Sequence, residues 1–428
     1  MVYLMDVSLG GQRLKGIMDT GSFEFVTFAY DCLTCGEAVR FDHEKSFTFE
    51  RGTETKTIVY GSGACIAGDG RDIVGLDGLL PKVQWFWEAH RCQMPLLEDA
   101  PFQAIVGIGP PGQAKVLATA RASQDATSQD KRDERRHDQA LRALSAEAGK
   151  TEFLPQFEVS SFSTCLGREM GSPGYFIWND VLPERGPGVV TAHVRSELTW
   201  SVHVTGASFK NETHGSFDAV ACTHGCAAIV DTGTTLMGLD TASYNGIFQY
   251  IRGMGKDCSD LSVFPPLRLK VGNGELTLPP EAYIGEVFGF AGFAQANSSR
   301  QMMDASRPSP FVNAMRVHQD GDEVKCQLLL MDMGTVVTSM GPQIILGMPV
   351  FREYYVHFHL GGAGGADRSI RFAPANDDCE PSSPADLRMD ASRKQHFGLV
   401  NSTIPAPRPP RKIDASMLHL PRTLTGEL

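Results

Sequence analysis

Residues 17–22 (Ile-Met-Asp-Thr-Gly-Ser) are nearly repeated, about half a chain later, by residues 229–234 (Ile-Val-Asp-Thr-Gly-Thr). In each copy two apolar residues lead into Asp-Thr-Gly and a hydroxyl residue, which predicts a buried strand that ends in a sharp glycine turn. A single copy is weak evidence because short motifs recur by chance, but two matching copies are strong evidence. If the two strand ends face each other, the carboxylates of Asp19 and Asp231 share one site. The alternative is two ordinary strand-and-turn signals with no common site.

Length, composition and charge narrow the class of protein. The chain has 428 residues, of which 42% are apolar and 21% charged, so it is ordinary for a globular protein and long enough for two lobes or more. The net charge of −11, without a long basic run, argues against nucleic acid as the main partner. No stretch of 18 apolar residues occurs, so no membrane span is predicted.

Further landmarks follow the two Asp-Thr-Gly copies. Residues 57–68 read as a strand, a glycine-rich turn directly after Tyr60, and a returning strand, which predicts a hairpin with a mobile tip. Residues 104–109 and residues 344–347 are apolar runs that end in glycine, one run after each copy. Each half of the chain therefore carries an Asp-Thr-Gly turn and then a buried apolar-Gly strand, which indicates a structural internal repeat.

Together these residues resemble the pepsin-like (family A1) aspartic proteases of eukaryotic type, and the resemblance covers residues 1–375 apart from two insertions. It implies a mostly β, bilobal fold with two β-barrel-like lobes, an interlobe sheet and an active-site cleft between the lobes. We expect residues 1–156 to form the N-terminal lobe and residues 157–375 the C-terminal lobe. Residues 376–428 are rich in Pro and Arg and lack apolar periodicity, so they are predicted to be disordered.

The two insertions differ in character. Residues 113–150 are rich in alanine and charged residues and predict a solvated helix, either a docking or processing segment or an exposed, tolerated insertion. Residues 286–325 contain Asn297 and a Pro-Ser-Pro sequence, and they predict a long loop in the second lobe.

The resemblance implies that Asp19 and Asp231 form a catalytic dyad. Two carboxylates about 3 Å apart cannot both ionise cheaply, so they share one proton and one pKa rises strongly. The ionised carboxylate activates a water molecule as general base, while the protonated one donates to the oxygen of the scissile carbonyl. The pair titrates as a unit, so neither role is assigned to one residue. No metal or organic cofactor is implied.

Other site residues follow from the same resemblance. The residues expected to support the dyad are Thr20, Gly21, Ser22, Thr232, Gly233 and Thr234. The residues expected to form the flap or to bind substrate are Tyr60, Gly61, Ser62, Ile17 and Ile345. Val26 stands where the family usually has a tryptophan that supports the flap tyrosine, so Tyr60 is expected to be less restrained than in relatives.

The chain has ten cysteines, and their spacing favours an oxidising compartment. The resemblance implies three disulfides, Cys32–Cys35, Cys222–Cys226 and Cys258–Cys326. A redox motif at Cys32–Cys35 is the alternative, but it needs a following helix that the sequence does not predict.

Four cysteines remain, and we predict two more bridges, Cys65–Cys92 and Cys165–Cys379. Cys92 lies on a stretch expected to pair with the returning strand that carries Cys65. Cys165 and Cys379 follow two strands expected to be neighbours in the interlobe sheet. Pairing requires Cα atoms within about 7 Å. The alternative is four isolated buried thiols.

The resemblance implies an aspartic endopeptidase that cleaves polypeptides at acid pH between apolar residues, as a monomer. Three acceptor sequons, at Asn211, Asn297 and Asn401, suit a glycoprotein of the secretory pathway, either secreted or vacuolar/lysosomal. The family normally has a signal peptide and a prosegment before residue 1, and we expect this sequence to lack both, because it is truncated or begins at an internal methionine.

The rival hypothesis is a catalytically silent pepsin-like protein that binds peptides without cleaving them. The intact aspartates and Tyr60 argue against it, whereas Val26 and the unusual Phe23-Glu24 argue mildly for it. Serine hydrolase and zinc protease motifs are absent from the sequence. His357 and His359 alternate along a predicted strand and could face a metal, but a hydrogen-bonded strand position is the favoured interpretation.

Overall fold

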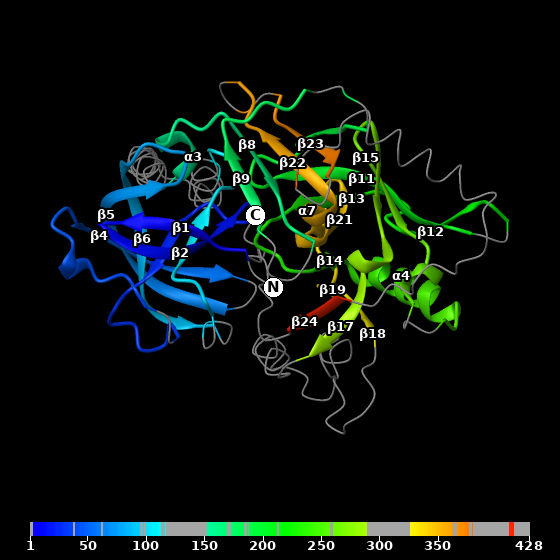
Figure 1. Ribbon diagram of the computed structural model, residues 1–428, viewed down its shortest axis with the longest axis horizontal. Helices are drawn as coiled ribbons and strands as arrows, with labels where there is room; N and C mark the ends of the chain where they lie inside the picture. The colour runs from blue at the N-terminus through cyan, green and yellow to red at the C-terminus, as the bar shows by residue number, and fades with distance from the viewer. Residues whose placement is uncertain are drawn as a thin grey trace, which may run out of the picture.

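A computed structural model describes most of the chain between residues 3 and 379. The described residues are 3–36, 39–60, 63–94, 97, 100–112, 116, 152–168, 173–183, 186, 188–211, 214–256, 260–288, 326–362, 365, 367–375, 379 and 411–414. Within them the chain is mostly β and forms two lobes joined by a further sheet (Figure 1). This is the bilobal, mostly β fold that the family resemblance implies.

The N-terminal lobe is a seven-stranded sheet with the order β1-β2-β7-β3-β6-β5-β4, shown in blue and cyan in Figure 1. Its strands are β1 (Met5–Leu9), β2 (Gln12–Asp19), β3 (Phe25–Phe28), β4 (Glu50–Tyr60), β5 (Gly63–Leu76), β6 (Lys82–Gln93) and β7 (Ala104–Gly107). β1 also pairs with β5, so the sheet curls back on itself. The β1–β2 turn uses Gly10 and Gly11, whose φ angles of 54° and 78° favour glycine.

A five-stranded sheet with the order β10-β23-β22-β8-β9 joins the lobes. Its strands are β8 (Ser161–Cys165), β9 (Tyr175–Trp178), β10 (Val190–His193), β22 (Tyr354–His359) and β23 (Ser369–Pro374). We expected the strands before Cys165 and Cys379 to be neighbours, which is wrong because β22 lies between β8 and β23. Two short helices each precede a strand of this sheet, α3 (Phe153–Gln156) before β8 and α7 (Met348–Glu353) before β22.

The C-terminal lobe is built on a nine-stranded sheet in which β16-β15-β11-β13-β21-β14-β19 form the main path. Its strands are β11 (Ser201–Lys210), β12 (Phe217–Ala221), β13 (Cys226–Val230), β14 (Met237–Leu239), β15 (Leu267–Val271), β16 (Gly274–Leu278), β19 (Leu330–Asp332), β20 (Val337–Thr338) and β21 (Gly341–Leu346). Helix α4 (Thr241–Gly253) follows β14, and the Asp240 side chain caps it by accepting from the amides of Ala242 and Ser243. Short 3-10 helices span His43–Lys45, Leu261–Val263 and Pro280–Ala282.

A small fourth sheet contains β17 (Ile284–Phe288), β18 (Cys326–Leu328) and β24 (Arg411–Asp414). β24 corrects the prediction that all of residues 376–428 are disordered, because its backbone pairs in parallel with β17 (Figure 1). The first residues of the predicted 286–325 loop likewise belong to β17. The rest of that loop, and residues 113–150 apart from Val116, lie outside the described residues.

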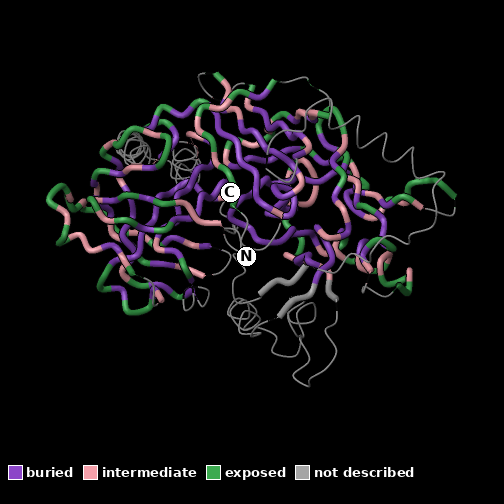
Figure 2. Tube along the Cα trace, in the orientation of Figure 1, coloured by how far each residue is buried: buried purple, intermediate pink, exposed green. Residues whose placement is uncertain are grey.

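Buried residues occur throughout both lobes and in the sheet that joins them (Figure 2). One large apolar cluster includes Phe162, Trp200 and Phe358, whose rings contact one another across β8, the start of β11 and β22. The lobes therefore share a core, which fixes the positions of the two Asp-Thr-Gly turns relative to each other. None of the helices within the described residues is long and apolar enough to cross a membrane.

Candidate active site

The two aspartates lie at equivalent points of two similar strand arrangements. Asp19 ends β2, which runs parallel to β7, and its carbonyl accepts from the Ile108 amide at 2.8 Å. Asp231 follows β13, which runs parallel to β21, and its amide donates to the Leu346 carbonyl at 3.0 Å. After each turn the chain comes back antiparallel to the same partner, as β3 against β7 and as β14 against β21. The sequence repeat is thus a repeat of local topology.

The glycines of the two apolar-Gly strands explain why these strands lie so close to the turns. A Cβ atom at Gly107 would lie 2.5 Å from the backbone nitrogen of Glu24, and one at Gly347 would lie 2.1 Å from the carbonyl oxygen of Leu236. A side chain at either position would collide with the backbone of the adjoining turn. Glycine therefore permits each turn to pass directly over its neighbouring strand.

A symmetric set of hydrogen bonds joins the two turns. The Thr20 amide donates to the Thr232 hydroxyl at 3.0 Å, and the Thr232 amide donates to the Thr20 hydroxyl at 2.9 Å. Each hydroxyl also donates across the lobe boundary, Thr20 to the Val230 carbonyl at 2.9 Å and Thr232 to the Met18 carbonyl at 2.6 Å. These buried bonds hold the two strand ends against each other at fixed separation.

Each aspartate accepts two hydrogen bonds from its own turn, one from an amide and one from a hydroxyl. The donors are the Gly21 amide (2.9 Å) and the Ser22 hydroxyl (2.6 Å) to Asp19, and the Gly233 amide (2.8 Å) and the Thr234 hydroxyl (2.5 Å) to Asp231. All six support residues predicted from the sequence therefore contact the dyad or cross-link its two turns. Their donors orient both carboxylates.

The carboxylates face each other across the junction. A Cβ atom on Gly21 would lie 2.6 Å from an Asp231 oxygen, and one on Gly233 would lie 2.3 Å from an Asp19 oxygen. Asp19 is 3% exposed and Asp231 is fully buried. Burial raises the pKa of Asp231 well above its ordinary value, and the nearby charge of Asp19 raises it further, against the opposing hydrogen bonds from its own turn. The arrangement therefore keeps a proton on the pair.

The β4–β5 hairpin, here called the flap, carries Tyr60 at the end of its first strand, paired with Gly63. Tyr60 is 3% exposed and belongs to an apolar cluster that also contains Val26 and Trp87. Val26 pairs in register with Trp87 of β6, so an indole lies beside the position where the family usually has tryptophan.

Four of the predicted flap or substrate-binding residues are either not described by the structure or are buried in it. Gly61 and Ser62 lie outside the described residues. Ile17 and Ile345 are 1% and 2% exposed within β2 and β21, so they offer almost no surface here. Their predicted role in apolar subsites stays a prediction.

Four of the five predicted disulfides are present. They are Cys32–Cys35, Cys65–Cys92, Cys165–Cys379 and Cys222–Cys226, with Cα–Cα distances of 4.1–5.5 Å. The predicted Cys258–Cys326 bridge lies outside the described residues, because Cys258 and the Cys326 side chain are not described.

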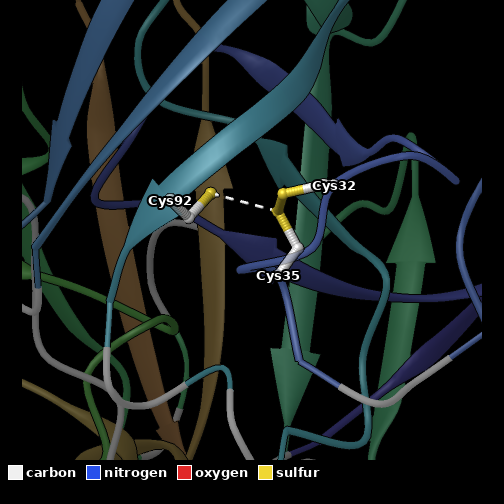
Figure 3. Close-up of side chains that lie close together, drawn as sticks. All are labelled: Cys32, Cys35 and Cys92. Atoms are coloured by element: carbon white, nitrogen blue, oxygen red, sulfur yellow. Dashed lines mark hydrogen bonds between the residues drawn. A yellow bond between two sulfur atoms is a disulfide. The ribbon is translucent and has the colours of Figure 1, made fainter.

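In Figure 3 the Cys32–Cys35 disulfide lies beside Cys92, with 3.4 Å between the sulfurs of Cys35 and Cys92. Among the described residues these three cysteines are the only group with potential metal-ligand atoms close together. All three are in disulfides, Cys32–Cys35 and Cys65–Cys92, so none offers a thiolate to a metal ion.

Two further residues at the site were not assigned from the sequence. Trp200 is fully buried, donates from its indole nitrogen to the Ile108 carbonyl at 2.9 Å, and accepts at its own carbonyl from the Val230 amide at 3.0 Å. Trp200 therefore contacts both halves of the site. Its indole binds Ile108, just after β7 beside the Asp19 turn, and its carbonyl binds Val230, the last residue of β13 before Asp231. Glu24, only 1% exposed, forms an ion pair with Lys56 of the flap. Neither long-range contact leaves a periodic signal in the sequence.

Comparisons with known proteins agree with this geometry. A sequence model of the family described as "Eukaryotic aspartyl protease" matches residues 2–375. Pepsin A of Gallus gallus is 25% identical over 369 residues, which cover 83% of this chain and 81% of that protein. Pepsin A of Bos taurus is 26% identical over 299 residues (66% and 70%), and gastricsin of Cavia porcellus is 25% identical over 295 residues (66% and 67%).

Proposed function

Because the chain belongs to the eukaryotic aspartyl protease family, we propose that it is an aspartic endopeptidase whose catalytic residues are Asp19 and Asp231. The observation that carries the proposal is the pair of buried carboxylates, facing each other and oriented by matched amide and hydroxyl donors. Such a pair supplies a base and an acid at one point, which hydrolysis of an amide requires.

The mechanism follows from the shared proton. The ionised carboxylate takes a proton from a water molecule as the water attacks the scissile carbonyl carbon. The protonated carboxylate donates to the carbonyl oxygen, and a proton then reaches the leaving amine. Gly21 and Gly233 amides, with the Ser22 and Thr234 hydroxyls, hold the carboxylate oxygens in place, so little reorganisation accompanies the reaction.

The substrate class is an extended polypeptide, cleaved between apolar residues under acid conditions. The dyad must retain one proton to donate, and the raised pKa of Asp231 helps it to do so, so activity should be lost once the pH is high enough to remove that proton. The flap carrying Tyr60 would close over the peptide and exclude water from the reacting bond. The four disulfides support a setting in the secretory pathway, either secreted or vacuolar/lysosomal.

The test is cleavage of a mixed peptide library at acid pH by the wild-type protein and by Asp19→Asn and Asp231→Asn variants. We expect wild-type cleavage and a loss of at least about 10³-fold in each variant, because neither amide can take a proton from water. Asp6→Asn is the matched control, since Asp6 is an exposed carboxylate of the same lobe paired with Lys15. A folded wild-type protein that binds peptides but cleaves none would favour the catalytically silent alternative.

A further inference from the structure

A partly buried ion pair, between Glu24 and Lys56, joins the first Asp-Thr-Gly turn to the flap. Glu24 is 1% exposed, and one of its carboxylate oxygens lies 2.9 Å from the Lys56 ammonium nitrogen. The same ammonium lies 4.2 Å from the centre of the Trp87 ring, so it sits between a carboxylate and an indole face. Both contacts are attractive for a cation, and partial burial strengthens them relative to a surface pair.

Glu24 is held to the turn that carries Asp19. Its carbonyl accepts from the Gly107 amide at 2.9 Å, and the Ser22 carbonyl accepts from the Gly109 amide at 2.7 Å. These bonds fix residues 22–24 onto the end of β7. A displacement of Glu24 would therefore disturb the backbone that positions Asp19.

Lys56 is held on the flap strand that carries Tyr60. Side chains alternate between the two faces of a strand, so Lys56, Ile58 and Tyr60 project from the same face of β4. Ile58 and Tyr60 pack in the apolar cluster that contains Trp87. Lys56 therefore projects from the same face of β4 as Tyr60, four residues before it.

We propose that Lys56 is a positioning residue, whose ion pair with Glu24 and contact with Trp87 fix the distance between flap strand β4 and the turn that carries Asp19. The inference rests on the proposed peptidase function and deepens it. Because Glu24 is buried, its attraction for the Lys56 ammonium is screened less by water than that of a surface carboxylate, so it restrains the Lys56 side chain more firmly. The restraint passes along β4 to Tyr60.

The test compares Lys56→Met and Lys56→Arg with the wild-type protein, using enzyme quantified by active-site titration. Lys56→Met keeps the apolar stem and removes the charge, so we expect a rise in KM of about tenfold with kcat changed less than about threefold. Amide hydrogen exchange of residues 56–60 should become faster. Lys56→Arg keeps the charge and can stack on Trp87, so its KM and its amide exchange at residues 56–60 should stay close to the wild-type values.

Lys45→Met is the matched control. Lys45 also lies between a carboxylate and a ring, 3.0 Å from Asp42 and 5.4 Å from the Tyr30 ring centre, but it is 68% exposed and lies outside the flap strands. We expect its kinetics and flap exchange to match the wild-type values. A change equal to that of Lys56→Met would overturn the assignment of a specific role to Lys56.

A double variant separates positioning from the cost of leaving the Glu24 carboxylate buried without the Lys56 ammonium. Glu24→Gln with Lys56→Met leaves no buried charge, so it should fold, and the proposal predicts that its flap still exchanges quickly and its KM stays raised. Wild-type exchange and KM in the double variant would overturn the proposal. If the wild-type protein cleaves no peptide, the proposed function fails, while the exchange measurements still decide the inference.

Discussion

A buried histidine in the sheet between the lobes should limit stability at acid pH. His357 of β22 is 1% exposed, and its Nδ1 lies 2.9 Å from the Ser163 hydroxyl. The same hydroxyl lies 2.5 Å from an oxygen of Asp180, which also accepts from the Tyr355 hydroxyl at 2.7 Å. This polar network is the hydrogen-bonded strand position predicted for His357 from the sequence.

The pKa of His357 is lowered to about 4, first because burial disfavours the imidazolium and then because the positive charge of Arg371 is near. Asp180 opposes this decrease and His359 adds to it. Between pH 6.5 and about pH 4 the unfolded chain binds a proton at this histidine and the folded chain does not. Stability therefore falls as the pH falls through this range, by about 3 kcal/mol in total at about 1.4 kcal/mol per pKa unit.

The perturbation is His357→Asn, because an asparagine amide can keep a hydrogen bond to Ser163 and cannot titrate. Urea denaturation at pH 7 and pH 4.5 gives the free energy of unfolding of each protein. The variant should lose about 2–3 kcal/mol less than the wild type between the two pH values. An equal loss in both proteins would refute the reasoning, because the pH dependence would then arise elsewhere.

Three further predictions concern the groups that hold the site together. Gly347→Ala should destabilise the protein by at least about 1–3 kcal/mol in urea denaturation, since its Cβ would lie 2.1 Å from a backbone oxygen, and an unchanged midpoint would contradict the close packing. Thr232→Val should cost about 1–3 kcal/mol because it leaves buried partners unpaired, and a thermal midpoint within error of the wild type would contradict the cross-link. Replacing Cys165 and Cys379 by serine should cost about 5 kcal/mol in the chain-entropy estimate, against about 2 kcal/mol for the three-residue Cys32–Cys35 loop, and equal costs would argue against that estimate.

The local parts of the site could be predicted from the sequence because their signals are local. An apolar pair before Asp-Thr-Gly marks a strand end and a turn, and the apolar-Gly runs mark the strands beneath, so the placement of Asp19 and Asp231 followed from the repeat. Cys65 and Cys92 could be paired because they lie opposite each other on β5 and β6.

Contacts that depend on the three-dimensional path of the chain could not be predicted in the same way. Cys165 and Cys379 were paired correctly for a wrong reason, since β22 lies between their strands and the chain reaches Cys165 only after β23 has ended. The Glu24–Lys56 pair and the Trp200 contact with Ile108 join distant positions with no shared pattern. Residues 411–414 were missed because their strand depends on backbone pairing with β17, more than 120 positions earlier, rather than on an apolar pattern of their own.

The pH dependence of kcat/KM for peptide cleavage tests the central claim most directly, that Asp19 and Asp231 share one proton needed for hydrolysis. With the concentration of folded enzyme measured by active-site titration at each pH, we expect activity to be highest in the acid range. Activity should then fall about tenfold per pH unit once the last proton leaves the pair. A profile that instead rises to a maximum near pH 9 would contradict the claim, because both carboxylates would be ionised there.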